Sequence, residues 1–385
     1  MAKARPTWTE VNLNALVENY RALDALLLHP APGAVQSGLR PRLIPVIKAN
    51  AYGHGAIPVA KALASAGATA FAVALVEEGV ALRQAGIKQE IIVLQGAWPG
   101  QEHELIHHNL TATVYSAEGL SRLQHSALRA QRVVSFHIKV DTGMARLGVR
   151  WDKMGEFADA IAAAKHITVA GIFSHLASAD EEDISFTDEQ ILRFEQSLAL
   201  LSRSGIQPGE IHFANSAGLL YAGGLRQFSA RPGIALYGYP PAPARCVVRL
   251  APALTLKTRL GRIHQIQAGD SVGYNRRFIA TQDMRVATLP VGYADGYRRD
   301  LAGLAKVIIN DRWARVLGTI SMDSIVVDIA ELPDVREGDE VILLGSSARC
   351  CMDANIWADL LGTIPYEILC GISSRVPRVY LQENR

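Results

Sequence analysis

The feature that most constrains the fold is a repeat of short apolar segments, each followed by an amphipathic helical pattern, from about residue 42 to residue 238. Strands that alternate with helices predict a parallel sheet, because parallel neighbours need a crossover connection. Eight strands within this stretch favour a closed (β/α)8 barrel of the TIM type over an open sheet. The candidate strands are residues 42–47, 70–75, 91–94, 111–114, 133–140, 167–173, 211–214 and 233–237.

The pattern changes after the proline-rich segment 240–243 (PPAP). The apolar runs beyond it are short and separated by turn residues, which is typical of an antiparallel β domain. We therefore predict an α/β protein with two domains: a barrel over residues 1–240 and a mostly antiparallel β domain over residues 241–385. A first strand around residues 7–11 belongs either to the barrel or to the β domain. The runs are residues 254–260, 285–289, 306–309, 324–328 and 340–344.

Composition narrows the classes of protein. The chain has 385 residues, of which 49% are hydrophobic and 20% charged, so it resembles an ordinary globular protein and not a disordered chain or a coiled coil. The net charge of +2 gives no electrostatic reason to expect nucleic acid or a membrane surface as a partner. The four cysteines show no CxxC spacing, the N-terminus lacks a signal peptide, and no apolar run is long enough to span a bilayer. We expect a cytoplasmic protein.

The carboxyl ends of barrel strands are where such enzymes place their chemistry. Lys48 follows the first strand in VIKANAYGHG, where an amine removed from water could form a Schiff base, or could simply extend to solvent. Lys139 lies inside a strand in HIKVDTGMARLG and needs an anionic partner if it is buried. Arg146, in the loop that follows, could bind a carboxylate through two N–H groups or could be an ordinary surface residue.

Later strand ends supply more polar groups. His175 lies in FSHLASAD, His212 and Ser216 lie in HFANSAG, and Arg231 with Gly233 lies in RPGI. Taken singly, such a histidine more often makes a structural hydrogen bond, and such a serine more often caps a helix than binds a phosphate. The histidines lack the close spacing of metal ligands, so we predict no metal site. The β domain adds Tyr293 in GYADG and Met322 in SMD.

In combination and in this order, these segments resemble the alanine racemase family, from Trp8 to about Tyr380. The resemblance implies a barrel that binds pyridoxal 5′-phosphate (PLP), a β domain, and interconversion of L- and D-alanine that supplies peptidoglycan. It also implies a homodimer with shared active sites, in which the β domain of one chain closes the barrel of the other.

The resemblance implies roles for individual residues as well. Lys48 looks like the lysine that forms the aldimine with the cofactor and acts on one face of the substrate, and Tyr293 looks like the second base, contributed by the partner subunit. Arg231 resembles the arginine that faces the pyridine nitrogen. Lys139 resembles a lysine that is often carbamylated in this family. The other implied contacts are Tyr52, Ser216, Gly233, Ile234 and Tyr366 for the phosphate, His212 behind Arg231, His175 beside Tyr293, and Arg146 and Met322 for the substrate.

The chain departs from the common family pattern at three positions. Ala145 stands where glycine is usual, Ser321 where cysteine is frequent, and Thr319 where an arginine is often found. The alternatives are a racemase for another amino acid, a PLP-dependent decarboxylase of the same architecture, and a non-catalytic PLP homeostasis protein. Homeostasis proteins look like the barrel alone, without a domain that carries a residue like Tyr293.

Overall fold

The computed structural model describes residues 5–27 and 40–382. The chain forms two compact units. The unit that we call the barrel unit contains the described residues of 16–51 together with residues 56–251. The unit that we call the β unit contains the described residues up to 15, residues 52–55, and the chain from residue 252 onward. We describe each unit by itself.

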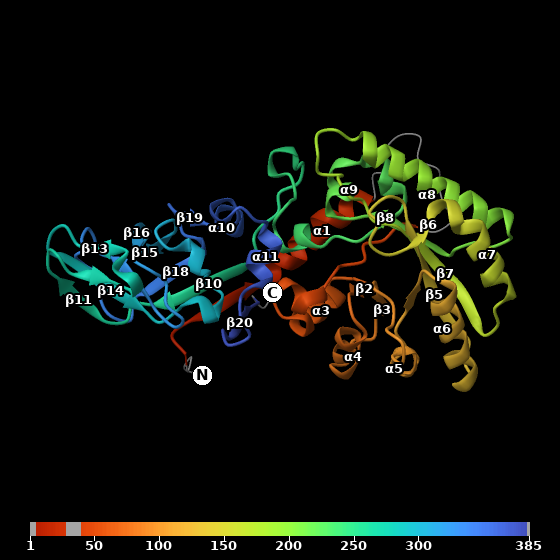
Figure 1. Ribbon diagram of the computed structural model, residues 1–385, viewed down its shortest axis with the longest axis horizontal. Helices are drawn as coiled ribbons and strands as arrows, with labels where there is room; N and C mark the ends of the chain where they lie inside the picture. The colour runs from red at the N-terminus through yellow and green to blue at the C-terminus, as the bar shows by residue number, and fades with distance from the viewer. Residues whose placement is uncertain (1–4, 28–39, 383–385) are drawn as a thin grey trace. The chain divides into compact units, whose positions relative to one another are not determined.

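The barrel unit contains a ring of parallel strands, as the alternating pattern predicts (Figure 1). Hydrogen-bonded ladders join neighbours through most of the ring. Single bridges complete it, because Leu43 pairs with Ala230, Val46 with Ala72, and Ile92 with Thr111. The (β/α)8 fold class is therefore confirmed. The strands are β2 (Ala70–Val73), β3 (Glu90–Val93), β4 (Ala112–Val114), β5 (Val134–Asp141), β7 (Ile167–Phe173), β8 (Glu210–Ala214) and β9 (Ser229–Ala230), and β6 (Val149–Arg150) pairs with β5.

One predicted strand is wrong. Residues 233–237 form a short 3-10 helix, η3 (Ile234–Tyr237), and the eighth position of the ring belongs to β9 instead. Pro232 lies between β9 and η3, and because it has no backbone N–H it cannot continue the ladder of hydrogen bonds. The first predicted strand, residues 42–47, is an extended segment that makes only the two single bridges at Leu43 and Val46.

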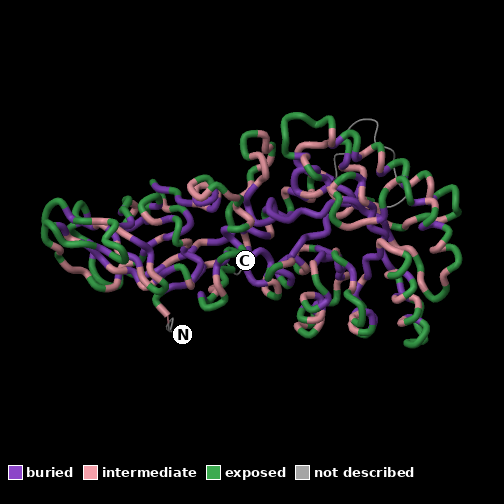
Figure 2. The backbone as a smooth tube through the Cα atoms, viewed as in Figure 1, coloured by how far each residue is buried: buried purple, intermediate pink, exposed green. Residues whose placement is uncertain are grey.

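Helices cover the outside of the strands (Figure 1). The strands are largely buried, whereas the helices alternate between buried and exposed positions, as expected for amphipathic helices with one face on a core (Figure 2). The helices are α1 (Leu13–Leu27), α3 (Ala56–Ser65), α4 (Val76–Gln84), α5 (Glu102–His107), α6 (Ala117–Arg129), α7 (Met154–Ala163), α8 (Ser185–Arg203) and α9 (Ser216–Tyr221).

The β unit is built on one large sheet, as its short apolar runs predict. Most neighbours are antiparallel, but β1 (Trp8–Asn12), between β10 and β20, is parallel to β20. Trp8 is completely buried there. The order along the sheet is β11 (Ile263–Ile266), β14 (Met284–Leu289), β17 (Ile325–Asp328), β16 (Arg312–Leu317), β15 (Lys306–Ile309), β18 (Glu340–Ser346), β10 (Leu254–Arg259), β1 and β20 (Arg378–Leu381). Smaller strands are β12 (Ser271–Val272), β13 (Phe278–Ile279) and β19 (Cys351–Met352).

Two short helices of the β unit were not anticipated from the sequence. They are α10 (Ala354–Leu361), which Asp353 caps by accepting a hydrogen bond from the Ile356 amide, and α11 (Pro365–Cys370). Trp357 of α10 is completely buried and packs edge-on against Tyr297, with 5.0 Å between the ring centroids. Of the described helices, none combines the length and apolar character that crossing a membrane requires.

Candidate active site

Lys48 stands where the first segment of the barrel ends, and the chain turns there in an unusual way. The short helix α2 (Lys48–Tyr52) contains residues with left-handed backbone angles: φ is 50° at Ala49, 53° at Asn50 and 54° at Ala51. Tyr52 continues the run at 51°. A left-handed conformation costs an ordinary residue roughly 1–2 kcal/mol, so this turn must be held by its surroundings.

Hydrogen bonds accepted by the side chains of Glu78 and Asn50 hold that turn against the neighbouring backbone. Glu78 of α4 accepts the Ala49 N–H at 2.6 Å. Its other oxygen accepts the Ala74 N–H at 2.8 Å. Asn50 accepts the Ala56 N–H at 2.8 Å. Lys48 therefore lies at the start of a turn whose backbone is fixed by side-chain hydrogen bonds.

Lys139, on β5, is buried with 6% of its surface exposed. Burial, followed by the positive charges of Arg146, Arg231 and Lys48, lowers its pKa to about 8, and Asp141 opposes this shift only partly. Its Nζ lies 5.5 Å from the centre of the Phe173 ring. The ammonium form of this side chain is thus less favourable than it is in a solvated lysine.

Arg231 follows β9 directly and is almost completely buried. Its Nη1 donates to the carbonyl oxygen of His212 at 2.5 Å and to the His212 Nδ1 at 2.9 Å. Its Nη2 donates to the Ser174 carbonyl at 2.5 Å. Burial lowers the pKa of Arg231 to about 9, which still leaves the guanidinium charged at neutral pH.

Both predicted histidines of the barrel unit are held in the neutral form. Burial lowers the pKa of His212 well below its usual range, and Arg231 and His137 add to the effect. Burial does the same for His175, with help from Arg231, Arg146, Lys139 and Lys48. The Nδ1 of His175 lies 3.5 Å from the Arg231 Nη2.

Ser216 and the residues after Arg231 form a second cluster in the barrel unit. The Ser216 hydroxyl accepts the Gly233 N–H at 2.9 Å and the Ala235 N–H at 3.3 Å. Capping of α9 falls to Asn215, whose side chain accepts the Gly218 N–H. The structure therefore brings Ser216 together with the backbone of Gly233 and η3, which begins at Ile234.

Arg146 lies exposed in the loop after β5. One oxygen of Asp141 organises that loop by accepting the Gly143 N–H at 3.0 Å and the Ala145 N–H at 3.1 Å. Ala145 has a left-handed φ of 54°. This is the position where the common family pattern has glycine, so the loop keeps a conformation that suits glycine better than alanine.

The remaining predicted residues belong to the β unit. The rings of Tyr52 and Tyr366 lie 5.9 Å apart, and burial raises the pKa of Tyr52, with smaller effects from Tyr366 and Cys370. Tyr293 and Met322 are exposed by 42% and 51%.

Tyr293 and Met322 lie on two chain segments that are joined by their backbones. The Tyr293 amide donates to the Ser321 carbonyl, and the Ala294 amide donates to the Met322 carbonyl, both at 3.1 Å. A Cβ atom added to Gly292 would lie 2.3 Å from the Met322 oxygen, so only glycine allows this approach. Tyr293 opens the short helix η6 (Tyr293–Asp295), and the buried Asp295 is paired with Arg5 at 2.6 Å.

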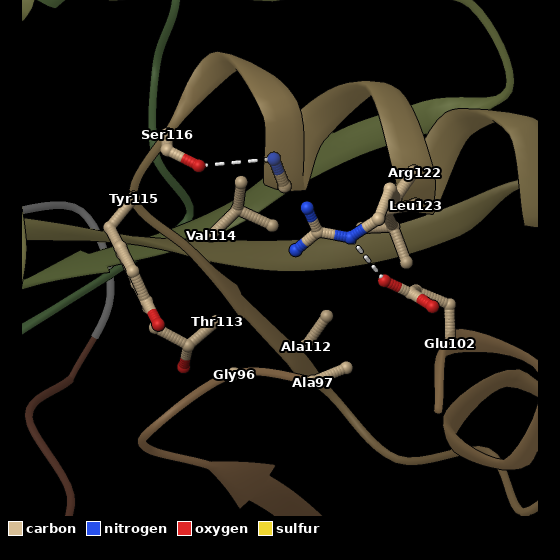
Figure 3. Close-up of a pocket in the computed structure, with 11 residues that line it drawn as sticks. Gly96, Ala97, Glu102, Ala112, Thr113, Val114, Tyr115, Ser116, Arg122 and Leu123 are labelled. Atoms are coloured by element: carbon tan, nitrogen blue, oxygen red, sulfur yellow. Dashed lines mark hydrogen bonds and ion pairs between the residues drawn. The ribbon is translucent and has the colours of Figure 1, made fainter. Parts of the chain in front are cut away.

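A pocket elsewhere in the barrel unit holds none of the predicted residues. Figure 3 shows it at the carboxyl end of β4, beside the first turns of α6. Two of its polar side chains are already paired: Arg122 donates to Glu102 at 2.7 Å, and Ser116 caps α6 by accepting the Gly119 N–H at 3.0 Å. In the part of the chain that the structure describes, no three His, Cys, Asp or Glu side chains come together as metal ligands would.

Family comparison places this geometry in a known group. Residues 11–241 match the family model "Alanine racemase, N-terminal domain", and residues 253–380 match "Alanine racemase, C-terminal domain". This chain belongs to the alanine racemase family. An alanine racemase of Symbiobacterium thermophilum is 43% identical over 377 residues, which cover 98% of this chain and 97% of that protein. One of Carboxydothermus hydrogenoformans is 39% identical and covers 98% and 100%.

Solved structures of the alanine racemase family share the fold. An alanine racemase of Clostridium difficile matches with a TM-score of 0.91 at 34% identity, covering 99% of this chain and 97% of that one. One of Bacillus anthracis with bound L-Ala-P matches with 0.91 at 32%, covering 100% and 97%. One of Bartonella henselae with covalently bound pyridoxal phosphate matches with 0.86 at 29%, covering 98% and 99%.

Some residues that hold the site were not singled out from the sequence. Glu78, Asp141 and His137 all contact or support predicted residues. A signal was present for His137, because it lies two residues before Lys139 on β5, and side chains two apart on a strand point to the same face. Nothing in the local pattern links Glu78 to the turn after Lys48, because the amide that it accepts there lies 29 residues away in the sequence.

The strained Ala145 yields a test of loop geometry. Ala145→Gly should raise the free energy of unfolding by about 1 kcal/mol, because glycine adopts positive φ without steric cost. Urea denaturation followed by circular dichroism measures this change. As the matched control, Ala199→Gly on the exposed face of α8 should lower stability by roughly 0.5–1 kcal/mol. A destabilised Ala145→Gly would contradict the strain.

Proposed function

We propose that this protein is an alanine racemase that interconverts L- and D-alanine with PLP as its cofactor. The observation that carries the proposal is the cluster of Lys48, Lys139, Arg146 and Arg231 within one barrel unit, in a chain that matches its relatives over nearly their whole length. In this proposal the barrel domain, residues 1–240 apart from the first strand that joins the sheet of the β unit, holds the cofactor, and residues 241–385 supply the second base. The enzyme works in the cytoplasm and supplies D-alanine for peptidoglycan.

The donors of the barrel unit fit PLP chemically. The Ser216 hydroxyl accepts two backbone N–H groups, so its own proton remains as a donor for a phosphate oxygen. Arg231 uses its Nη atoms on protein acceptors, and among the described residues no partner accepts from its Nε–H, which suits an acceptor such as a ring nitrogen. Tyr52, Tyr366, Gly233 and Ile234 complete the proposed phosphate site. When bound, PLP withdraws electrons from the substrate and stabilises the charge left at its α-carbon.

The residues of the chain then have separate roles in proton transfer, in substrate binding and in holding Arg231. Lys48 takes or returns the α-proton on one face, and Tyr293 of the partner subunit does so on the other. Arg146 and the backbone of Met322 orient the carboxylate of the substrate. His212 and Ser174 hold Arg231 through the bonds described above. His175 stays neutral and can hydrogen-bond the tyrosine.

The first test is the activity itself. The purified protein should convert L-alanine to an equal mixture of both enantiomers, and the D/L ratio should be measured for alanine, serine and several other amino acids. Lys48→Ala should abolish conversion, and borohydride should attach the cofactor to Lys48 in the wild type, because a lysine nucleophile binds PLP covalently. Faster conversion of another amino acid would redirect the substrate assignment. Release of carbon dioxide would indicate a decarboxylase instead.

A second test addresses the shared site. The exposure of Tyr293 and Met322 supports a homodimer in which these side chains enter the barrel of the other chain. Lys48→Ala and Tyr293→Phe should each be almost inactive, because each lacks one of two required bases. After subunit exchange between the two variants, about half the activity per mixed dimer should return, since one of its two sites is intact. If exchange is verified and no activity returns, both bases come from one chain.

A third test concerns Lys139. A pKa of about 8 means that the folded protein binds fewer protons than the unfolded chain between about pH 8 and 10.5, so the unmodified lysine makes stability rise with pH in that window. The neutral amine also reacts with carbon dioxide, forming an N–C bond and releasing one N–H proton to solvent, and the resulting carbamate anion would pair with Arg146. At fixed dissolved ¹³CO₂, the carbamate signal should therefore increase from about pH 7 to about pH 9.

The control for that measurement is a surface lysine. Lys139→Met should remove the ¹³C carbamate signal, whereas Lys165→Met, at an exposed position, should leave it in place. Arg146 loses its anionic partner in Lys139→Met, so KM for alanine should rise by about tenfold, as expected for one charged hydrogen bond. A signal that persists in Lys139→Met would assign the carbamate to another amine.

A further inference from the structure

Arg231 begins a column of polar side chains that runs through the interior of the barrel. His212 of β8 lies next to it, and the His212 Nε2 lies 2.8 Å from the Nδ1 of His137 on β5. The Nε2 of His137 faces Glu90 Oε1 at 3.8 Å. Glu90 is the first residue of β3, whereas Arg231 follows the end of β9, so the column connects the two ends of the strands.

At the Glu90 end of the column, ion pairs with Arg42 hold the carboxylates in place. Arg42 donates to both oxygens of Glu210 at 2.7 Å, and to Glu90 at 2.5 Å. Thr111 donates its hydroxyl proton to the other Glu90 oxygen at 2.9 Å. Both carboxylates therefore have fixed orientations, and Glu90 places negative charge 3.8 Å from the His137 Nε2, which is longer than a hydrogen bond.

The direction of every hydrogen bond follows from Arg231. A guanidinium has donors only, so the His212 Nδ1 must be an acceptor and carries no proton. His212 is buried and neutral, so its proton is on Nε2 and is donated to the His137 Nδ1. His137 is also buried, and burial lowers its pKa, so its single proton is on Nε2 and points toward Glu90.

We propose that His137 is a positioning residue that fixes the tautomer of His212, and that Arg231, His212 and His137 form a one-directional chain of donors that points toward the Glu90 carboxylate. With His137 as its acceptor, His212 keeps Nδ1 unprotonated and retains its bond from Arg231. Without that acceptor, the Nε2–H of His212 would be buried and unpaired, and the other tautomer would set an N–H against the Arg231 N–H. The proposal deepens the proposed function, because Arg231 is the residue assigned to the pyridine nitrogen.

The decisive measurement determines which ring nitrogen of His212 and of His137 carries the proton. Holoenzyme containing histidine labelled with ¹⁵N in the ring should show His212 and His137 as neutral imidazoles with the proton on Nε2, by two-dimensional ¹H–¹⁵N NMR at neutral pH. Signals are assigned by their loss in His137→Asn and in His212→Asn. A proton on His212 Nδ1, or a doubly protonated His212, would falsify the chain.

A pair of variants separates positioning from packing. His137→Asn keeps an acceptor oxygen near the place of Nδ1, whereas His137→Leu fills the space without one. His137→Asn should keep the His212 tautomer and stay within about threefold of the wild-type kcat. His137→Leu should show mixed tautomers and about a tenfold lower kcat, the effect of one lost hydrogen bond, with KM nearly unchanged because His137 is not assigned to substrate. His125→Asn, at an exposed position, is the control and should change nothing.

The outcomes distinguish this proposal from the proposed function. The tautomers are measured in the spectrum of the wild type, so this test of the proposal does not depend on which reaction the enzyme catalyses. If the Nε2–H tautomers are found and alanine is not racemised, the chain is supported and the function is not. If the spectra and kcat of His137→Leu and His137→Asn are alike, His137 does not set the tautomer and the proposal is wrong.

Discussion

The interior of the barrel is organised around a buried guanidinium that touches no carboxylate among the described residues. Removing such a charge from water is costly unless hydrogen bonds replace the hydration. Arg231 obtains them from three backbone carbonyls and from the imidazole nitrogens of His212 and His175, and because these acceptors are neutral they do not cancel its charge. That charge has consequences for its neighbours. It helps to keep His175 and His212 neutral, and it contributes to the low pKa of Lys139.

The same electrostatics favour anions near Lys48. Lys48, Arg146 and Arg231 each lower the pKa of Lys139, and Asp141 is the carboxylate that opposes them. A site with this excess of positive charge binds a phosphate or a substrate carboxylate more readily than a cation. It also explains why a carbamate on Lys139 is chemically reasonable, since the modification exchanges an unfavourable cation for an anion. The left-handed turn after Lys48 belongs to this picture, because strain of this kind persists where surrounding contacts, here Glu78 and Asn50, determine the backbone.

The sequence predicted the elements that belong to a repeated pattern. It did not predict elements whose structure depends on one proline or on tertiary contacts. Alternation of strands and helices was sufficient for the ring from β2 to β8. It was insufficient at residues 233–237, where an apolar run follows Pro232 and becomes a 3-10 helix. The helices α10 and α11 are too short for their sequences to show a clear helical periodicity of apolar residues within a β-rich region. Strand-end motifs located Lys48, His175, Ser216 and Arg231, but the acceptors that hold them, such as the Ser174 carbonyl and Glu78, are set by tertiary structure.

The contacts within the β unit fix the backbone around the two residues that it would contribute to the proposed site. Backbone hydrogen bonds tie Tyr293 and Ala294 to Ser321 and Met322, and the glycine at 292 lets the two segments approach. Asp295 closes the turn by accepting the Gly292 N–H at 3.2 Å, and it is itself anchored by Arg5 and Arg375. Because these contacts lie within one unit, the backbone that carries Tyr293 and Met322 is fixed without the barrel. In the proposed dimer, association therefore only has to bring the pre-ordered backbone of Tyr293 and Met322 to the barrel of the partner. The loss of conformational entropy that would oppose the formation of the shared site is then small.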